Sequence, residues 1–292
     1  MSNEYIVDSF PYLLGKDIDG VNQPIKKAQE IVFSIVLEID RICRKNNIPY
    51  ALAFGSALGL YNYQGFIPWD DDADIAIDYA DLPRLIEALK NDLSSEYELV
   101  SYYTDERYNV LIPHIKVKKK VGFMRDKNYR RLKDRTNSYE GFFVDIVAFM
   151  GMPSKSKHRA ILFKSQVKMI FYFISDFFFN HDPIKMKRKI KKQEAAAAEL
   201  YKDAPYVCQT PFIPFQTAGV NLYPRDVIYT FKEYEFNGVK LYSFNNVREF
   251  CRIRYQERNL KKLVNDQFID PWPKSKRKTL HIKAYSLTKE IK

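Results

Sequence analysis

The sequence predicts an α+β fold, in which a mixed sheet with flanking helices is followed by a mainly helical C-terminal part. Three observations favour this class. Some segments repeat apolar residues at helical spacing, and others alternate them with polar residues. Of the 292 residues 46% are hydrophobic, which is enough for a core. Ten glycines and fourteen prolines are too few for a low-complexity chain. We expect a core over residues 1–150 and a helical, basic, aromatic-rich part over 151–292 packed on it.

Within the first part, the clearest element is a helix over residues 25–47, because its apolar residues recur on one face and Pro24 suits a helix start. A buried strand is expected over 49–54, ending at Gly55-Ser56. The remaining expected elements are a short helix over 57–61, a strand over 72–78, a helix over 81–93, strands over 97–102, 110–117, 120–124 and 142–148, and a polar loop over 125–140.

The pattern changes after Pro153. Residues 161–179 read as an aromatic-rich helix and 184–201 as a basic helix. Asn237-Gly238 is typical of a hairpin turn, and a further helix is expected over 246–259.

Charge is distributed unevenly along the chain. The first hundred residues carry a net charge of −9 and the remainder +20, for a total of +11. A basic part of this size favours an anionic partner such as nucleic acid, a phosphorylated glycan or anionic lipid. The alternative is that basic side chains only keep the surface soluble.

Cysteine usage and the N-terminus bear on localisation. The three cysteines are widely spaced and form neither a disulfide framework nor a metal knuckle, which suits a reducing compartment. Residues 1–11 lack the pattern of a secretory signal. We expect a cytoplasmic protein, located at the inner face of the membrane if its partner is a lipid.

Residues 161–179 are too often interrupted by charge to cross a membrane, since a span needs about 20 predominantly apolar residues. Lys164, Lys168 and Asp176 all fall within the segment. It is either a core helix or an interfacial patch that approaches a lipid-linked substrate, with its lysines extending towards headgroups.

The most informative stretch contains four acidic residues within five positions, from Asp70 to Asp74. On a strand, Asp70, Asp72 and Asp74 project from one face, with neighbouring groups roughly 7 Å apart. Carboxylates at this spacing can share a divalent cation, and oxygen ligands favour Mg²⁺ or Mn²⁺. The alternative is an acidic cap or surface turn, which the alternation with buried apolar residues disfavours.

Two further features accompany these acids. Gly55-Ser56 lies where a strand ends and a helix begins, a place where backbone N–H groups can bind phosphate. Asp145 is a lone charge within an apolar strand, costly to bury unless it binds a metal or another partner. The alternative is that Asp145 is a buried polar residue whose hydrogen bonds are satisfied within the protein. A Gly-Ser turn, a two-carboxylate strand and a third acid on a later strand together resemble the nucleotidyltransferase fold.

The resemblance becomes more specific over longer segments. Residues 50–59 read YALAFGSALG and residues 65–75 read GFIPWDDDADI. Together with Val144-Asp145-Ile146, they resemble the LicD family of phosphotransferases, to which fukutin-type ribitol-phosphate transferases are related. The resemblance covers roughly residues 30–150. Tyr255-Gln256 stands where the family usually has Tyr-Gly, and residues 270–273 and His281 match its terminal positions only loosely.

The resemblance implies a nucleotidyltransferase-like catalytic core that moves a phospho-alcohol, foremost phosphocholine, from a CDP-linked donor to a sugar hydroxyl with release of CMP. The acceptor implied is a cell-surface glycan or teichoic acid precursor of the cell wall, met as a lipid-linked glycan at a peripheral membrane contact. The resemblance implies that Asp72, Asp74 and Asp145 bind Mg²⁺ or Mn²⁺, and Asp145 is alternatively the base. It implies that the donor phosphate is bound by Gly55, Ser56 and Lys116. Asp70 and Trp69 would support the site.

A choline group would need an aromatic cage. Candidates near the acids are Tyr61, Tyr63, Phe66 and Trp69.

Two other functions compete with this interpretation. A nucleotidyltransferase acting on RNA could grip a single strand through the basic residues 125–135, although no RNA-binding module is recognisable and nucleic acid is the less favoured partner. A non-catalytic protein could dock on anionic membrane through residues 171–192, but intact Asp72, Asp74 and Asp145 argue against it.

Overall fold

The structure is a computed structural model. It describes residues 15–16, 22–23, 25–67, 70, 72–101, 103–104, 115–119, 123–124, 142–164, 167, 171, 183–210, 221–256, 263–264, 267–268 and 285–286. Trp69, the expected loop over 125–140, residues 270–273 and His281 lie outside this part of the chain.

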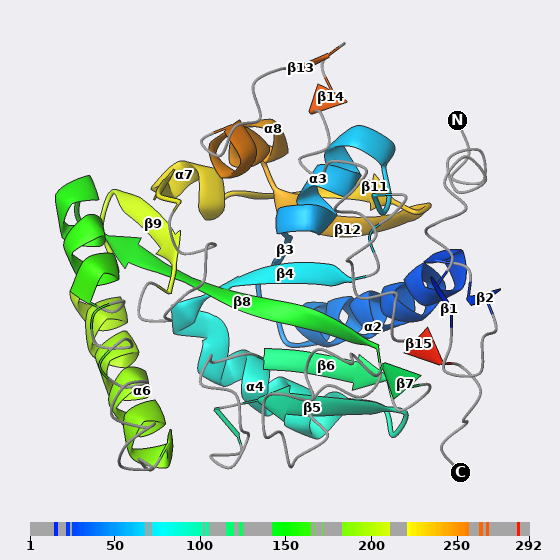
Figure 1. The fold of residues 1–292 in the computed structure, drawn as a ribbon, viewed down its shortest axis with the longest axis horizontal. Helices are drawn as coiled ribbons and strands as arrows, with labels where there is room; N and C mark the ends of the chain where they lie inside the picture. The colour runs from blue at the N-terminus through cyan, green and yellow to red at the C-terminus, as the bar shows by residue number, and fades with distance from the viewer. Residues whose placement is uncertain are drawn as a thin grey trace.

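A mixed sheet forms the centre of the molecule (Figure 1). Its strand order is β10-β9-β8-β4-β3-β12-β11, and β6 adds to β8 and β5 to β6. The β4–β8 and β3–β12 pairs are parallel and the other pairs are antiparallel. The strands are β3 (Ala51–Leu52), β4 (Ala73–Asp78), β5 (Tyr97–Ser101), β6 (Ile115–Lys119), β8 (Phe143–Met152), β9 (Tyr206–Gln209), β10 (Tyr223–Pro224), β11 (Phe231–Phe236) and β12 (Val239–Phe244).

Helices flank this sheet. α2 contacts α4 as well as β6 and β8, whereas α3 and α8 contact each other near the β11–β12 hairpin, and α6 runs along the end of β8 (Figure 1). The helices are α2 (Ile25–Lys45), α3 (Phe54–Tyr63), the 3-10 helix η2 (Tyr79–Asp81), α4 (Leu82–Asp92), α6 (Pro183–Leu200), α7 (Arg225–Ile228), α8 (Val247–Cys251) and the π-helical η5 (Arg252–Gln256). Residues 155–164 are also helical.

Three short strand pairs complete the described elements. They are β1 (Gly15–Lys16) with β2 (Asn22–Gln23), β7 (Phe123–Met124) with β15 (Tyr285–Ser286), and β13 (Leu263–Val264) with β14 (Gln267–Phe268). None of the helices that the structure describes is long and apolar enough to span a membrane.

The α+β class is confirmed. Residues after 150 contribute more strand than a mainly helical part implies, because β9 to β12 join the same sheet as β3, β4 and β8. The predicted hairpin forms, with Asn237 and Gly238 both at positive φ in its turn. The helix expected from residue 57 starts earlier, at Phe54, and Ala57 N–H already bonds to Ala53 O at 3.0 Å.

An aromatic cluster in the core joins segments that are far apart in the sequence. Phe54, at the start of α3, stacks on Phe149 of β8 with ring centroids 6.0 Å apart. Phe250 of α8 stacks on Phe244 at 4.2 Å and on Tyr223 at 5.1 Å. Each fully buried ring contributes about 1.5–3 kcal/mol, so this cluster holds α8 and the segment after it against the β3–α3 turn.

Candidate functional site

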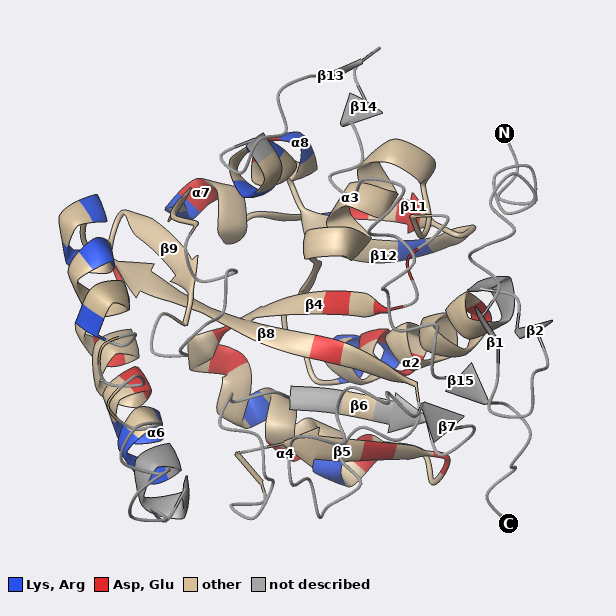
Figure 2. Cartoon of the chain, in the orientation of Figure 1, with Lys and Arg blue, Asp and Glu red and all other residues tan. Residues whose placement is uncertain are grey.

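Asp74 and Asp145 are register partners on the parallel strands β4 and β8. Their chain neighbours Ala73, Ile75 and Val144 are buried on one face, so the two carboxylates project from the other face, where both are half-buried. Adjacent strands lie about 4.8 Å apart. Figure 2 shows the two acidic positions side by side on these strands. The sheet therefore brings together two acids that are 71 positions apart in the sequence.

Lys116 of β6 is the register partner of Asp145 on its other side. Three neighbouring strands thus place Asp74, Asp145 and position 116 in one row across the sheet. The side chain of Lys116 lies outside the described part of the structure.

Asp72 lies just before β4 and is half-buried. In the part of the chain that the structure describes, no three His, Cys, Asp or Glu side chains converge closely enough to hold a metal ion. Two adjacent carboxylates nevertheless fit Mg²⁺, which is commonly bound by one or two carboxylates together with substrate phosphates and water. The donor set is all oxygen, as such an ion prefers.

Ser56 fixes the backbone of Asp74. Its Oγ accepts a hydrogen bond from Asp74 N–H at 3.0 Å, and Ala53 N–H donates to Asp74 O at 3.0 Å. Ser56 is only 3% exposed. The Gly-Ser turn therefore positions Asp74 directly. The contact of Ser56 with donor phosphate stays a prediction.

Gly55 allows Asp70 to approach the first turn of α3. A Cβ atom at position 55 would lie 2.6 Å from Asp70 Oδ2, closer than real Cβ contacts occur. The N-cap residue Ala53 provides no side-chain cap for this helix. A carboxylate at the positive end of a helix is stabilised by the helix dipole. Any side chain at position 55 would therefore displace the Asp70 carboxylate from a favourable position.

Gln29 of α2 holds the loop that carries Asp70. Its Nε2 donates to Ile67 O at 3.0 Å and to Asp70 O at 2.7 Å, and Gln29 is 7% exposed. Sequence reasoning missed this residue. The available signal was a long polar side chain next to Ala28 and Val32 on the apolar face of the predicted helix.

Phe54 has a φ of 46°, which is unusual for a bulky residue. Backbone in this region costs about 1–3 kcal/mol and concentrates at functional sites. The ring contacts with Phe149 and Phe250 offset that cost. The strained residue directly precedes Gly55, so the strain lies at the strand-to-helix turn that carries the site.

The C-terminal segment Arg252–Gln256 also reaches the site. Burial raises the pKa of the Tyr255 hydroxyl, and the nearby negative charges of Asp74 and Asp70 raise it further. The Arg254 guanidinium carbon lies 4.8 Å from the Phe54 ring centroid. Sequence reasoning noted Tyr255 but missed Arg254, because nothing in the local sequence links residue 254 to residues 54–74.

Among the candidates for an aromatic cage, Phe66 belongs to the core. It is 2% exposed and makes edge contacts with Phe33 and Phe236. Tyr61 and Tyr63 are half-buried on α3.

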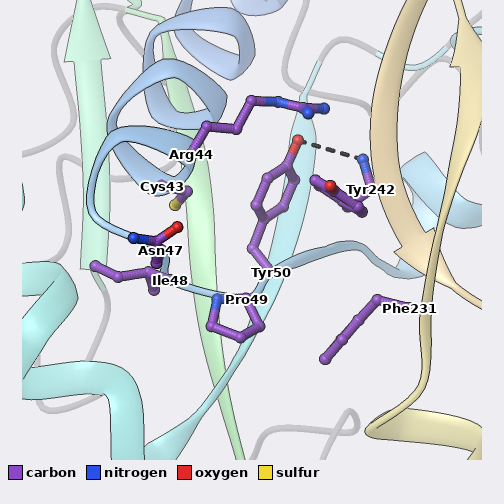
Figure 3. A pocket seen from close by; sticks show the side chains of 8 residues that line it. All are labelled: Cys43, Arg44, Asn47, Ile48, Pro49, Tyr50, Phe231 and Tyr242. Carbon is purple, nitrogen blue, oxygen red and sulfur yellow. Dashed lines mark hydrogen bonds between the residues drawn. The ribbon is translucent and has the colours of Figure 1, made fainter.

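A separate pocket of about 480 Å³ lies at the opposite end of β3 (Figure 3). Two of its polar side chains are paired within the protein: Tyr50 donates to Asp40 Oδ1 at 2.6 Å, and Arg44 pairs with Asp40 and Glu233. Its lining residues are Cys43, Arg44, Asn47, Ile48, Pro49, Tyr50, Phe231 and Tyr242. None of the predicted site residues lines it.

Residues 47–189 match the family model described as LicD/FKTN/FKRP, nucleotidyltransferase domain. The match contains the β3–α3 turn, the acidic strand and Asp145. Over these residues, which make up just under half of the chain, the sequence is similar to the LicD family.

Two curated proteins are similar to the chain. It is 22% identical over 139 residues to the lipopolysaccharide cholinephosphotransferase LicD of Haemophilus influenzae, covering 46% of this chain and 47% of that protein. It is 35% identical over 85 residues to an uncharacterized protein of Rickettsia prowazekii, covering 29% of this chain and 30% of that protein. The chain thus spans about half or less of the length of these relatives.

Among solved structures, terminal uridylyl transferase 4 from Trypanosoma brucei with bound GTP is similar over 50% of this chain and 37% of that chain, with a TM-score of 0.23 and 11% identity. At this level the similarity adds nothing to the assignment.

Proposed function

We propose that the protein transfers a phospho-alcohol, foremost phosphocholine, from a CDP-linked donor to a sugar hydroxyl and releases CMP. The observation that carries the proposal is the pairing of Asp74 with Asp145 across parallel strands, inside the segment that matches the LicD family. The name of the Haemophilus relative states the same class of transfer.

Asp74 and Asp145 would hold Mg²⁺ or Mn²⁺, with Asp72 contributing from the start of the strand. The metal would offset negative charge on the transferring phosphoryl group. Ser56 would keep Asp74 in place through its bond to the Asp74 N–H group. Gly55, Ser56 and Lys116 would bind donor phosphate, and Asp70 and Trp69 would support the metal-binding strand.

In the reaction, the acceptor hydroxyl oxygen forms a bond to the phosphorus atom that carries the alcohol. The bond from that phosphorus to the bridging oxygen breaks, and CMP departs with the electron pair. The hydroxyl proton passes either to solvent or to a carboxylate. In its alternative role as the base, Asp145 is that carboxylate. Because the core covers one face of the two strands, substrates would approach from the face on which the acids project.

For the acceptor, we propose a glycan or teichoic acid precursor that is linked to lipid at the inner face of the membrane. Two features support a surface contact. Phe163 and Phe171 are each 67% exposed, and the exposed Arg188, Lys189 and Lys192 of α6 form a basic stretch (Figure 2). Exposed aromatic and basic side chains together suit an anionic interface.

The test is incubation of the purified protein with CDP-choline or CDP-ribitol and Mg²⁺, with and without a glycan acceptor, while CMP is quantified. We expect acceptor-dependent release of CMP from CDP-choline. Asp74→Asn, which we expect to lose activity, serves as the matched control. No CMP from either donor with several glycan acceptors would contradict the proposal, and preferential use of CDP-ribitol would change the alcohol that is transferred.

A further inference from the structure

Two nitrogen atoms of the Arg254 guanidinium lack hydrogen-bond acceptors among the residues that the structure describes. Its Nε and Nη1 atoms are buried from solvent and have no hydrogen-bond partner. Burying such donors without partners is unfavourable, and more so for a charged group. A protein tolerates that cost where a ligand completes the interactions.

The position of Arg254 is well defined by its surroundings. Its guanidinium lies over the ring of Phe54, 4.8 Å from the ring centroid, and 6.0 Å from the ring of Tyr255. Its carbonyl accepts a hydrogen bond from Asn221 Nδ2 at 3.1 Å, and Asn221 is 1% exposed. The backbone and the plane of the guanidinium are therefore both held before any ligand arrives.

This arginine lies at the edge of the acidic site. Phe54, which forms its floor, directly precedes Gly55 and Ser56. The Asp70 carboxylate approaches Gly55, and the Ser56 hydroxyl accepts a hydrogen bond from Asp74 N–H at 3.0 Å. Despite this proximity, the described residues provide Arg254 with no ion pair. A fork of guanidinium donors next to two acids is suited to a multiply charged anion that a metal also binds.

We propose that Arg254 binds the diphosphate of the donor, next to the turn that carries Gly55 and Ser56. The π-helical segment η5 supplies this contact, so a part of the chain outside the matched family segment completes the donor site. The identity of the donor rests on the proposed function, whereas binding of a diphosphate by Arg254 does not.

The inference is tested by calorimetric titration of the full chain with inorganic pyrophosphate, CDP-choline, CMP and cytidine. Arg254→Gln is expected to weaken pyrophosphate and CDP-choline binding about 10- to 100-fold, to weaken CMP binding less and to leave cytidine binding unchanged. Arg254→Lys should recover part of the loss, since it keeps the charge but loses the fork. Arg252→Gln, which removes an exposed charge two positions away, is the matched control.

A second variant separates binding from a structural role. Arg254→Met keeps the packing over Phe54 and removes the unsatisfied donors, so it should melt at the same temperature as the wild type or higher while losing pyrophosphate affinity. Wild-type affinity for pyrophosphate in Arg254→Gln, or no binding of pyrophosphate by the wild type, would overturn the inference. Arg254-dependent binding of pyrophosphate without binding of CDP-choline would support it and contradict the proposed donor.

Discussion

The acidic pair Asp74 and Asp145 and the single acid Glu194 all lie in apolar surroundings, but they differ in burial and in hydrogen bonding. Asp74 and Asp145 stand next to each other on neighbouring strands and remain half-buried. Glu194 of α6 is fully buried; its Oε2 accepts a hydrogen bond from the Tyr103 hydroxyl at 2.8 Å. Burial raises the Glu194 pKa to about 7. Asp74 and Asp145 are partly exposed and have a carboxylate neighbour in register, whereas Glu194 is enclosed and is stabilised by a proton.

The comparison teaches that burial of an acid does not by itself identify a functional site. What distinguishes Asp74 and Asp145 from Glu194 is a second carboxylate in register and partial exposure of both side chains. A set of substitutions tests each half of this contrast.

The largest effect is expected at Asp74. Asp74→Asn should leave the fold intact and reduce Mg²⁺-dependent transfer about 10³-fold, because an amide poorly replaces a charged ligand. Turnover with purified donor and acceptor measures it, and Asp203→Asn, an exposed position, is the control. Near wild-type turnover in Asp74→Asn would remove the residue from the site.

Asp145→Asn distinguishes its two proposed roles. If Asp145 is a metal ligand, the substitution should weaken Mg²⁺ affinity, and high Mg²⁺ should partly rescue the rate. As a base, it should lower the rate at saturating Mg²⁺ while the affinities for metal and donor stay the same. Titration of Mg²⁺ against donor binding decides between the two, and we expect the shifted titration of a ligand.

Glu194 should control the pH dependence of stability. Because its folded pKa of about 7 is above the ordinary value of 4.5, the folded state binds the extra proton between these values. Its contribution is therefore fully present below about pH 4.5 and is lost as the pH rises to about 7, by up to about 3 kcal/mol. Urea unfolding at pH 5 and pH 8 should show the loss in the wild type but not in Glu194→Gln.

The control for this measurement is Glu199→Gln on the same helix, where the side chain is 77% exposed. It should retain the wild-type pH dependence. An unchanged slope in Glu194→Gln would mean that another group dominates stability in this range.

A smaller effect is expected at Gly55. Gly55→Ala should displace Asp70 and lower turnover about 10-fold through the shifted acidic loop. In an Asp70→Ala background the same substitution should have little further effect, because the clash is gone. Gly238→Asn, in an open turn where a Cβ contacts nothing within 4 Å, is the control. Additive losses in the double variant would contradict the role given to Gly55.

The smallest effect concerns the surface. If Phe163 and the basic face of α6 meet a lipid-linked acceptor, the protein should bind anionic vesicles several-fold better than neutral ones, with weaker binding at high salt. Phe163→Ser should lessen the difference without altering CMP release from a soluble acceptor. Equal binding to both vesicle types, measured by co-sedimentation, would argue against the membrane contact.

The sequence alone determined the local features of this protein. Periodicity located α2, β4, α4 and the β11–β12 hairpin to within a few residues, because each has a continuous apolar pattern or a characteristic turn. The chemistry of the acids was also readable, since Asp72 and Asp74 stand in a run of carboxylates and Asp145 is a lone charge in an apolar strand. Those signals lie within single elements and need no knowledge of their neighbours.

Only the tertiary structure decided which of these groups meet. The β4–β8 register places Asp74 beside Asp145, and the β3–β12 pairing together with the Phe54, Phe149 and Phe250 cluster brings Arg254 to the turn at Gly55. Gln29 and Ser56 likewise gain their roles from partners on other elements. Strand pairing and side-chain packing join residues up to two hundred positions apart, and no local pattern in the sequence records which partners they choose.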